Sequence, residues 1–166
     1  MNISLNDIQI SNELQSGDLG YVIYLHGKRY KEENNYGIGF EAYVAMGLHE
    51  FYSKYDPQTN RVWVCRHQGN IIGFMLMMNR GDAAQLRYFL IEPAYRGIGL
   101  GKKLMNLYMD FLRQCHYKAS YLLTTDELPT AAHLYKSKGF VLIEEKDSTA
   151  FEKIVKEQKY EMKMEY

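Results

Sequence analysis

The clearest pattern of apolar and polar positions falls at residues 100–113. Leucine, tyrosine and phenylalanine recur there at helical spacing on one side, and lysine, asparagine, aspartate and arginine take the other side, which predicts an amphipathic helix. A second helix is predicted at 40–55, where apolar residues follow the i, i+3, i+4, i+7 pattern before the DPQTN loop (56–60). The turn and capping residues of SGDLG (16–20) predict another helix that begins near Asp18.

Runs rich in β-branched and aromatic residues predict the strands. RVWVCRH (61–67) and IIGFMLMMN (71–79) flank QGN, and together they predict a hairpin with a glycine-containing turn. Further strands are predicted at IQIS (8–11), AQLRYFLI (84–91), YLLTT (121–125), FVLIEE (140–145) and KYEMKM (159–164), and a short helix closed by Gly139 at PTAAHLYKSK (129–138). This order predicts an α/β protein with a mixed sheet.

Length, composition and charge restrict the class of protein. The 166 residues suit one domain, so we expect a single domain over 1–166. No apolar run approaches the roughly 20 residues of a membrane span, the start lacks a secretory signal, and the two cysteines lack metal-like spacing. We therefore expect a cytoplasmic protein with no membrane partner and no bound metal. A net charge of zero gives no overall field for nucleic acid, so no nucleic-acid partner is expected.

The segment YRGIGLGKK (95–103) places Gly97, Gly99 and Gly101 where the strongest helix begins. Each glycine costs roughly 0.8–1 kcal/mol of helix propensity, which indicates a use for bare backbone. A strand, a turn of bare backbone and a helix direct the first helical N–H groups at an anion, usually a phosphate. The alternative is a tight turn in which the glycines only allow close packing.

Two common phosphate-binding motifs do not fit this segment. A dinucleotide G-x-G-x-x-G fingerprint would need glycine in place of Lys102. A Walker A loop would need glycine in place of Arg96 and serine or threonine in place of Lys103.

The remaining pattern, Arg96-x-x-Gly99-x-Gly101 after Glu92-Pro93, resembles the acetyl-CoA pyrophosphate loop of the GNAT superfamily of N-acetyltransferases. That loop reads Gln or Arg, x, x, Gly, x, Gly or Ala. AAHLYKSKGF (131–140) resembles the family's second signature, and the resemblance extends over about residues 61–146. It implies the GNAT fold: a single mixed, mostly antiparallel, twisted sheet of about seven strands with about four helices, splayed between the fourth and fifth strands.

The same resemblance implies an enzyme, an acyltransferase that transfers an acetyl group from acetyl-CoA to a primary amine by direct attack in a ternary complex. We expect a small-molecule amine as the acceptor. Tyr135 matches the family position whose phenol lies near the sulfur of the cofactor and acts as general acid, so the resemblance implies that it contacts acetyl-CoA; the alternative for this residue is a tyrosine of the core. The implied cofactor contacts are the backbone of Leu90 and Ile91 for the pantetheine, and of Arg96, Gly97, Ile98, Gly99, Leu100, Gly101 and Lys102 for the pyrophosphate.

The sequence leaves the general base open. The strand at 85–88 has no carboxylate where many relatives carry one, so either a water chain or a residue of the first two helices accepts the proton. His26 and Glu41 are the candidates, together with Glu33 and Glu50, because a neutral histidine or a carboxylate can accept a proton at pH 7. The ordinary alternatives are a structural histidine and solvated glutamates. For the acceptor pocket we expect two tyrosines of these helices, at positions 30 and 43.

Other functions stay open. The stretches 17–37 and 40–51 also resemble the acetyltransferase half of bacterial proteins in which a MarR-type regulator precedes this domain, and we expect that DNA-binding module to be absent here. A protein lysine or N-terminal acetyltransferase is one alternative. A non-catalytic acyl-CoA-binding module is another, supported by the missing strand carboxylate. Dimerisation is common among relatives, so a homodimer is a further expectation.

Overall fold

The computed structural model describes residues 3–166. Within these residues, seven strands are hydrogen-bonded in the order β1-β2-β3-β4-β5-β7-β6 in a mixed sheet. The α/β class and the mixed sheet predicted from the sequence are therefore confirmed. The chain divides into two compact units: unit 1 contains the segment up to Gln15, Asp56–Ser120 and Lys163–Tyr166, and unit 2 contains Ser16–Tyr55 and Tyr121–Met162.

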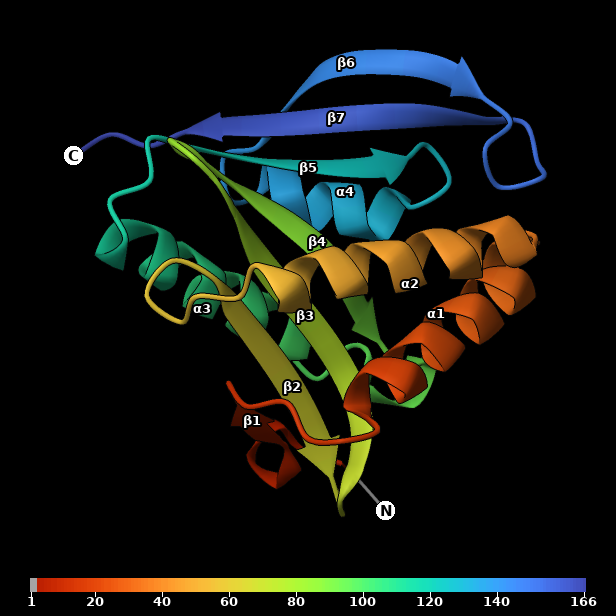
Figure 1. Ribbon diagram of the computed structural model, residues 1–166, viewed down its shortest axis with the longest axis horizontal. Helices are drawn as coiled ribbons and strands as arrows, with labels where there is room; N and C mark the ends of the chain where they lie inside the picture. The colour runs from red at the N-terminus through yellow and green to blue at the C-terminus, as the bar shows by residue number, and fades with distance from the viewer. Residues whose placement is uncertain (1–2) are drawn as a thin grey trace. The chain divides into compact units, whose positions relative to one another are not determined.

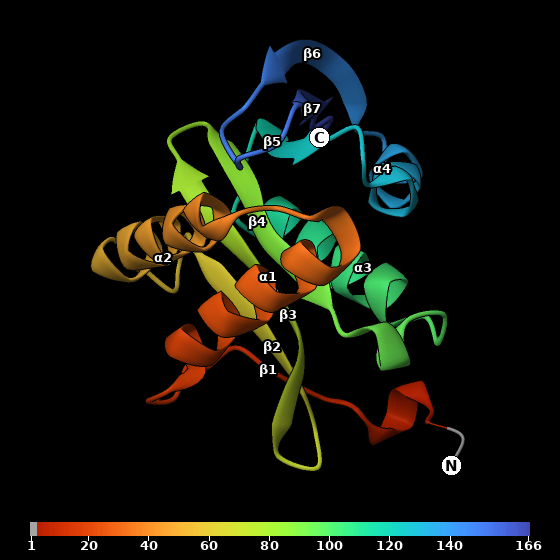
Figure 2. The same ribbon diagram turned by 90° about the vertical axis from the view of Figure 1, so that its right-hand side faces the viewer.

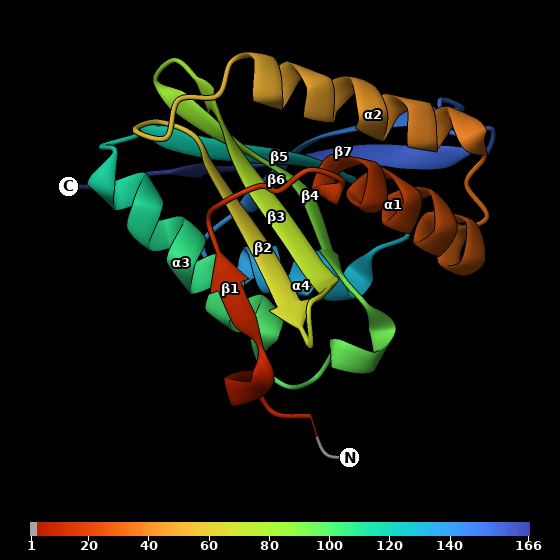
Figure 3. The same ribbon diagram turned by 60° about the horizontal axis from the view of Figure 1, so that its bottom comes forward.

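Unit 1 is built on four neighbouring strands and one long helix. β2, β3 and β4 run side by side (Figure 1), and β1 lies beside β2 (Figure 3). The predicted hairpin joins β2 to β3, with Gln68 and Gly69 in the left-handed region at φ 50° and 82°. The elements are η1 (Leu5–Asp7), β1 (Gln9–Ser11), β2 (Arg61–His67), β3 (Asn70–Arg80), β4 (Ala83–Ile91), η2 (Pro93–Tyr95), α3 (Leu100–Gln114) and the first residues of β5 (Ala119–Thr125).

The apolar side of α3 packs on one face of the unit 1 strands. Leu104, Tyr108 and Leu112 are fully buried, as the amphipathic pattern predicts. The ring of Trp63 on β2 lies 6.0 Å from the ring of Tyr108 and 6.2 Å from that of Phe111, measured between centroids. Each such buried side chain contributes roughly 1.5–3 kcal/mol to stability, so this contact fixes α3, and the loop before it, against the strands.

A β-bulge interrupts the pairing of β3 with β4. Leu76 pairs with Arg87, and Phe74 pairs with Leu90, so the pairing shifts between these positions. Tyr88, in the bulged segment, has φ 53°, a conformation that is unusual for a bulky side chain. Leu76 and Phe74 are two residues apart on β3 and share a face, so their partners Arg87 and Leu90 also share a face.

Unit 2 contains the first two helices and the C-terminal strands. α1 (Asp18–Asn34) and α2 (Ile38–Ser53) contact each other, and α4 (Pro129–Lys136) lies beside the strands β6 (Val141–Ser148) and β7 (Val155–Lys163) (Figures 1 and 2). β6 and β7 are antiparallel. The loop between these strands contacts the turn between α1 and α2, where the amide of Gly37 donates to the carbonyl oxygen of Phe151 at 3.0 Å.

The predicted helices and strands are confirmed, with bounds that differ by a few residues. β6 is longer than predicted and continues to Ser148, and α4 ends earlier, at Lys136. Gly139 follows α4 with φ 94°, the left-handed conformation expected of a glycine near a helix end. None of the helices in residues 3–166 combines the length and the apolar character that a membrane crossing requires.

Candidate active site

The glycine loop between β4 and α3 follows the predicted course. Gly97 has φ 80° and Gly99 has φ 90°, values that suit glycine far better than any residue with a Cβ. A Cβ built on either glycine would meet no atom within 4 Å. Close packing therefore does not explain these two glycines, and the open space beside them is what a loop that binds an anion requires.

The N-terminus of α3 adds the donors that a diphosphate needs. Gly99 is the N-cap and has no side chain to cap the helix, and the first intrahelical bond runs from the amide of Lys103 to the carbonyl of Gly99 at 3.0 Å. The amides of Leu100, Gly101 and Lys102 precede that bond and point out of the helix end. The positive end of the helix dipole favours an anion at the same place.

Hydrogen bonds from Arg96 tie the loop to the end of β4. Its Nε donates to the carbonyl oxygen of Ile91 at 2.9 Å, and its own amide donates to Pro93 at 3.2 Å. The amides from Gly97 onward are therefore the better candidates for phosphate binding than the amide of Arg96. The carbonyl of Ile91 would have to accept a cofactor N–H in addition to Arg96.

A second contact holds the segment before the loop. Nδ1 of His67, at the end of β2, lies 2.9 Å from the hydroxyl of Tyr95 in η2, and the two rings meet edge to face at 5.5 Å. Sequence reasoning missed this pair, because nothing in the local pattern around position 67 points to a residue 28 positions away.

The predicted acceptor tyrosines belong to an aromatic cluster in unit 2. The ring of Tyr30 lies 4.4 Å from that of Phe40 and 5.4 Å from that of Tyr36, and Tyr43 lies 5.6 Å from Phe151. Phe151 comes from the β6–β7 loop and also stacks on Tyr36 at 5.3 Å. The structure thus brings Tyr30 and Tyr43 into one cluster, with three further aromatic rings between them.

Polar groups border this cluster. The hydroxyl of Tyr36 lies 2.7 Å from Oγ1 of Thr125 at the end of β5, and burial raises the pKa of Tyr36. Lys153 bonds the carbonyl of Asn34 at 2.8 Å and pairs with the carboxylate of Glu127. Sequence reasoning missed Thr125, Glu127 and Lys153, because they reach the cluster only through contacts between distant parts of the chain.

Tyr135 is buried in α4, between Phe140 at 6.2 Å and Tyr160 at 6.4 Å between ring centroids. Burial is the main cause that raises the pKa of its phenol, and the neighbouring Tyr30 adds a smaller effect in the same direction. The phenol is therefore protonated at any pH at which the protein would work, as a proton donor must be.

His26 and Glu41 differ in how well they suit a general base. His26 is buried, and its Nδ1 donates to the carbonyl of Val22 at 2.8 Å. Burial lowers the pKa of His26 to about 4, with a small opposing effect from that hydrogen bond, so the imidazole is neutral at pH 7 but holds a proton weakly. Glu41 is half-buried on α2, and its carboxylate lies over Gly27 of α1, where a Cβ would come within 2.5 Å of Oε2.

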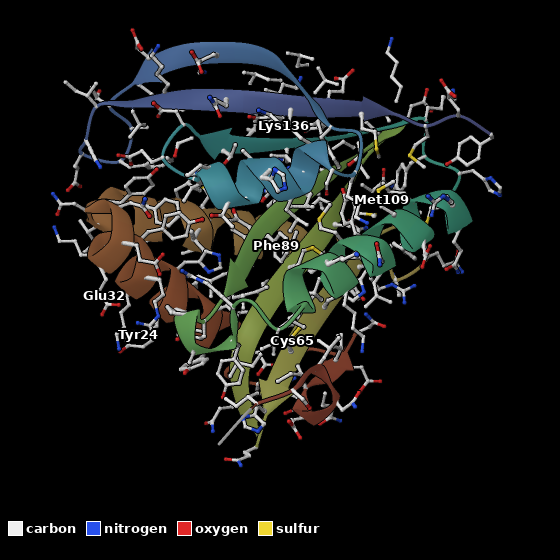
Figure 4. The ribbon with its side chains drawn as sticks, turned by 180° about the vertical axis from the view of Figure 1, so that it is seen from behind. Tyr24, Glu32, Cys65, Phe89, Met109 and Lys136 are labelled. Atoms are coloured by element: carbon white, nitrogen blue, oxygen red, sulfur yellow. The ribbon has the colours of Figure 1, made fainter. Side chains whose placement is uncertain are left out.

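Other side chains of α1 point to solvent. Figure 4 shows Tyr24 and Glu32 at the surface of this helix, and both are exposed. The glycine at position 27 is thus the place where α1 leaves room for a carboxylate of its neighbour α2.

A profile of the acetyltransferase (GNAT) domain family matches residues 58–142, just over half of the chain. The matched region contains the glycine loop, α3 and Tyr135. The chain belongs to the GNAT acetyltransferase family. The family membership therefore supports the resemblance from which the expected site residues were taken.

Two curated relatives resemble this GNAT chain. It is 34% identical over 97 residues to the N-acetyltransferase YjgM of Escherichia coli, which covers 56% of this chain and 58% of that protein. It is 30% identical over 95 residues to N-acetylaspartate synthetase of Danio rerio, which covers 56% of this chain and 33% of that protein. The chain thus spans little more than half of the first relative and a third of the second.

Solved structures of GNAT proteins share the fold over nearly the whole chain. A GNAT family acetyltransferase from Staphylococcus aureus has a TM-score of 0.77 at 19% identity and covers 95% of this chain and 99% of its own. Spermidine N-acetyltransferase from Vibrio cholerae, in complex with CoA and spermine, has a TM-score of 0.66 at 23% identity and covers 95% of this chain and 96% of its own. At these identities the likeness supports the fold of the GNAT chain.

Proposed function

We propose that this GNAT chain is an acetyl-CoA-dependent N-acetyltransferase that acetylates the primary amine of a small molecule within a ternary complex. The observation that carries the proposal is the pair Gly97 and Gly99, both left-handed and both facing open space at the N-terminus of α3. A backbone of this form, together with the family signature around it, suits the pyrophosphate of coenzyme A.

The donor side of the proposed site lies in unit 1. The amides of Gly97 to Lys102, including Ile98, bind the pyrophosphate, and the backbone of Leu90 and Ile91 pairs with the pantetheine as an added strand would. Bound acetyl-CoA supplies an activated acyl thioester. Arg96 holds the loop in place through Ile91, so that the binding amides are ordered before the ligand arrives.

The reaction then needs a proton acceptor and a proton donor. The amine attacks the thioester carbon, so that a C–N bond forms and the C–S bond breaks, and the departing sulfur takes a proton. We assign Tyr135 as the donor of that proton, because burial keeps its phenol protonated. We assign Glu41 as the group that takes the proton of the amine, directly or through water, in preference to the weakly basic His26.

Tyr30 and Tyr43 complete the proposal on the acceptor side. Their cluster offers apolar ring faces together with phenol hydroxyl groups, which suit a small organic amine. One of the proteins with a similar fold, the spermidine N-acetyltransferase from Vibrio cholerae, is named for a small amine. Two alternative functions remain to be distinguished from acetylation of a small amine. One is a protein lysine or N-terminal acetyltransferase, and the other is a non-catalytic acyl-CoA-binding module.

Calorimetry with coenzyme A and a thiol-release assay with acetyl-CoA and a panel of small amines test the proposal. We expect CoA binding in the micromolar range and turnover of at least one small amine. No binding of CoA by the folded chain would refute the proposal. Binding without turnover of any amine or peptide would favour the non-catalytic module, and turnover of peptide lysines alone would favour a protein-modifying enzyme.

Four expectations about the architecture and assembly of the protein belong to the same proposal. They are a single N-acetyltransferase domain over residues 1–166, a splay between β4 and β5, a relationship to the acetyltransferase half of MarR-type fusion proteins, and a homodimer. Sedimentation equilibrium would test the homodimer. A cytoplasmic location is also proposed. Both cysteines, Cys65 and Cys115, are free, as they would be in a reducing compartment.

A further inference from the structure

Two guanidinium groups converge on one sulfur atom in unit 1. Nη2 of Arg80 and Nη1 of Arg87 each donate to Sδ of Met78 at 3.7 Å. Nε of Arg80 also donates to Oε1 of Gln85 at 2.9 Å, and the guanidinium of Arg87 lies 4.7 Å from the centre of the Tyr88 ring. These contacts hold two half-buried cations side by side, Arg80 at the end of β3 and Arg87 in the middle of β4.

The bulge in β4 places Arg87 on the same face as Leu90. Without it, residues three apart on a strand would point to opposite faces. The observed register pairs Arg87 with Leu76 and Leu90 with Phe74, so the side chains of Arg87 and Leu90 emerge on one face, one two-residue repeat apart, or roughly 7 Å. Met78 and its partner Gln85 continue the same face, and Arg80, two residues beyond Met78, does so as well.

This face is the one that α3 does not cover. α3 packs on Trp63, whose partner on β3 is Met75. Met75 is an odd-numbered residue of β3, whereas Phe74, Leu76 and Met78 alternate with it and point to the other face. The proposed pyrophosphate site at the start of α3 and the arginine pair therefore lie on opposite faces of β4, with the proposed thioester position at Leu90 and Ile91 between them.

Two arginines in this place select for negative charge. A guanidinium binds a carboxylate with two parallel N–H donors, and a second guanidinium beside it adds attraction for an anion and repels a cation. A polyamine would bring a further positive charge toward both arginines. An amine that carries a carboxylate would bring the charge that they bind.

Resting on the proposed function, we propose that Arg87, supported by Arg80, binds a carboxylate of the acceptor, so that the acceptor belongs to the amino acids rather than to the polyamines. Arg87 is then a specificity-determining residue of the site. Gln85 orients Arg80 through Oε1, and the ring of Tyr88 orients the plane of Arg87. The alternative is that the pair only stabilises the pairing of β3 with β4, which predicts no effect on the choice of acceptor.

The test compares acceptors that differ only in charge. Initial rates with acetyl-CoA are measured for L-aspartate, L-glutamate and L-methionine, for the same compounds with every carboxylate replaced by a carboxamide, and for spermidine. We expect at least one carboxylate form to exceed its amide tenfold or more in kcat/KM. Arg87→Gln should reduce that ratio at least tenfold, chiefly through KM for the carboxylate form, and Arg80→Gln should reduce it in the same direction. Arg113→Gln, an exposed arginine paired with Asp110 on α3, should leave the ratio unchanged.

The outcomes separate the inference from the proposed function. Equal kcat/KM for acids and amides, a preference for spermidine, or an unchanged ratio in both Arg87→Gln and Arg80→Gln would overturn the inference and leave the acetyltransferase intact. Absence of turnover with every amine would refute the enzyme. Calorimetry of the CoA-loaded chain with L-glutamate would then decide the inference: binding that Arg87→Gln weakens tenfold supports it, and absence of binding overturns it.

Discussion

Gly97 and Gly99 show how a single residue can be required by backbone conformation alone. Both face open space, so no neighbouring atom excludes a side chain, yet both have φ near 80–90°. An L-residue in that conformation is strained by roughly 1 kcal/mol or more. Relaxing the strain would rotate the peptide groups on either side, which are the groups proposed to bind the pyrophosphate.

Replacing Gly99 by alanine should therefore weaken CoA binding tenfold or more and lower stability by about 1 kcal/mol. Calorimetry with CoA and thermal unfolding measure the two effects. Gly81→Ala is the matched control, because Gly81 has φ 82°, also faces open space and lies in the β3–β4 turn. It should lose similar stability and keep its CoA affinity, and an equal loss of affinity in both variants would contradict the role given to the loop.

Tyr135→Phe tests a single hydroxyl group. Because the ring and its packing on Phe140 and Tyr160 are kept, the variant should fold and bind acetyl-CoA with unchanged KM. Loss of the proton donor should lower kcat tenfold or more, measured by thiol release. Tyr160→Phe, in the same cluster, is the control and should keep its kcat. A Tyr135→Phe enzyme with the wild-type kcat would remove this residue from the mechanism.

At the scale of elements, apolar periodicity placed the helices and strands, because each buries one face against its neighbours. The amphipathic pattern at 100–113 became α3, whose apolar side covers Trp63. The bulge in β4 was not predicted, because the left-handed Tyr88 is imposed by the pairing with β3 and tyrosine itself has no preference for that conformation. Local patterns report which face of an element is buried, and they do not report register.

The residues of the candidate site also fall into those that the sequence could predict and those that it could not. The glycine loop and Tyr135 could be predicted, because each belongs to a short motif with a fixed spacing. Phe151 and Lys153 could not, because they join the aromatic cluster through the β6–β7 loop, and Lys153 bonds Asn34 across 119 positions. The arginine pair was also missed. Its convergence depends on the strand register and on the bulge.

The contact between α1 and α2 offers a test of Glu41. Gly27→Ala adds a Cβ that would lie 2.5 Å from Oε2 of Glu41, so the flexible carboxylate must move. Helix propensity improves by up to about 1 kcal/mol, which should keep the stability within about 1 kcal/mol of wild type. If Glu41 takes the proton of the amine, kcat should fall tenfold or more, as it should in Glu41→Gln. Gly20→Ala, also in α1 but facing open space, should keep full activity, and a fully active Gly27→Ala would argue against Glu41.

For the molecule as a whole, stability should depend on pH through buried groups whose pKa differs between the folded and the unfolded chain. Burial raises the pKa of Cys65 and Tyr117 to about 12. The folded chain keeps these protons at a pH where the unfolded chain loses them, so stability should fall as the pH rises past the ordinary thiol value of 9.0. At the acid end, His26 acts in the opposite direction.

The acid side of the stability curve should therefore depend on His26. Its pKa is about 4 in the folded chain and 6.5 when unperturbed, so between these values the unfolded chain binds one more proton and the free energy of unfolding rises with pH. The contribution is complete above pH 6.5 and lost toward pH 4, about 3 kcal/mol in all. Urea unfolding at pH 4.5 and 7.5 measures it. His26→Asn, whose side-chain amide can replace Nδ1 as the donor to Val22, should remove most of the difference, whereas His133→Asn, at an exposed histidine of α4, should keep it. If His26→Asn retained the full wild-type difference, the acid sensitivity would have to come from other groups and His26 would not be held neutral by burial.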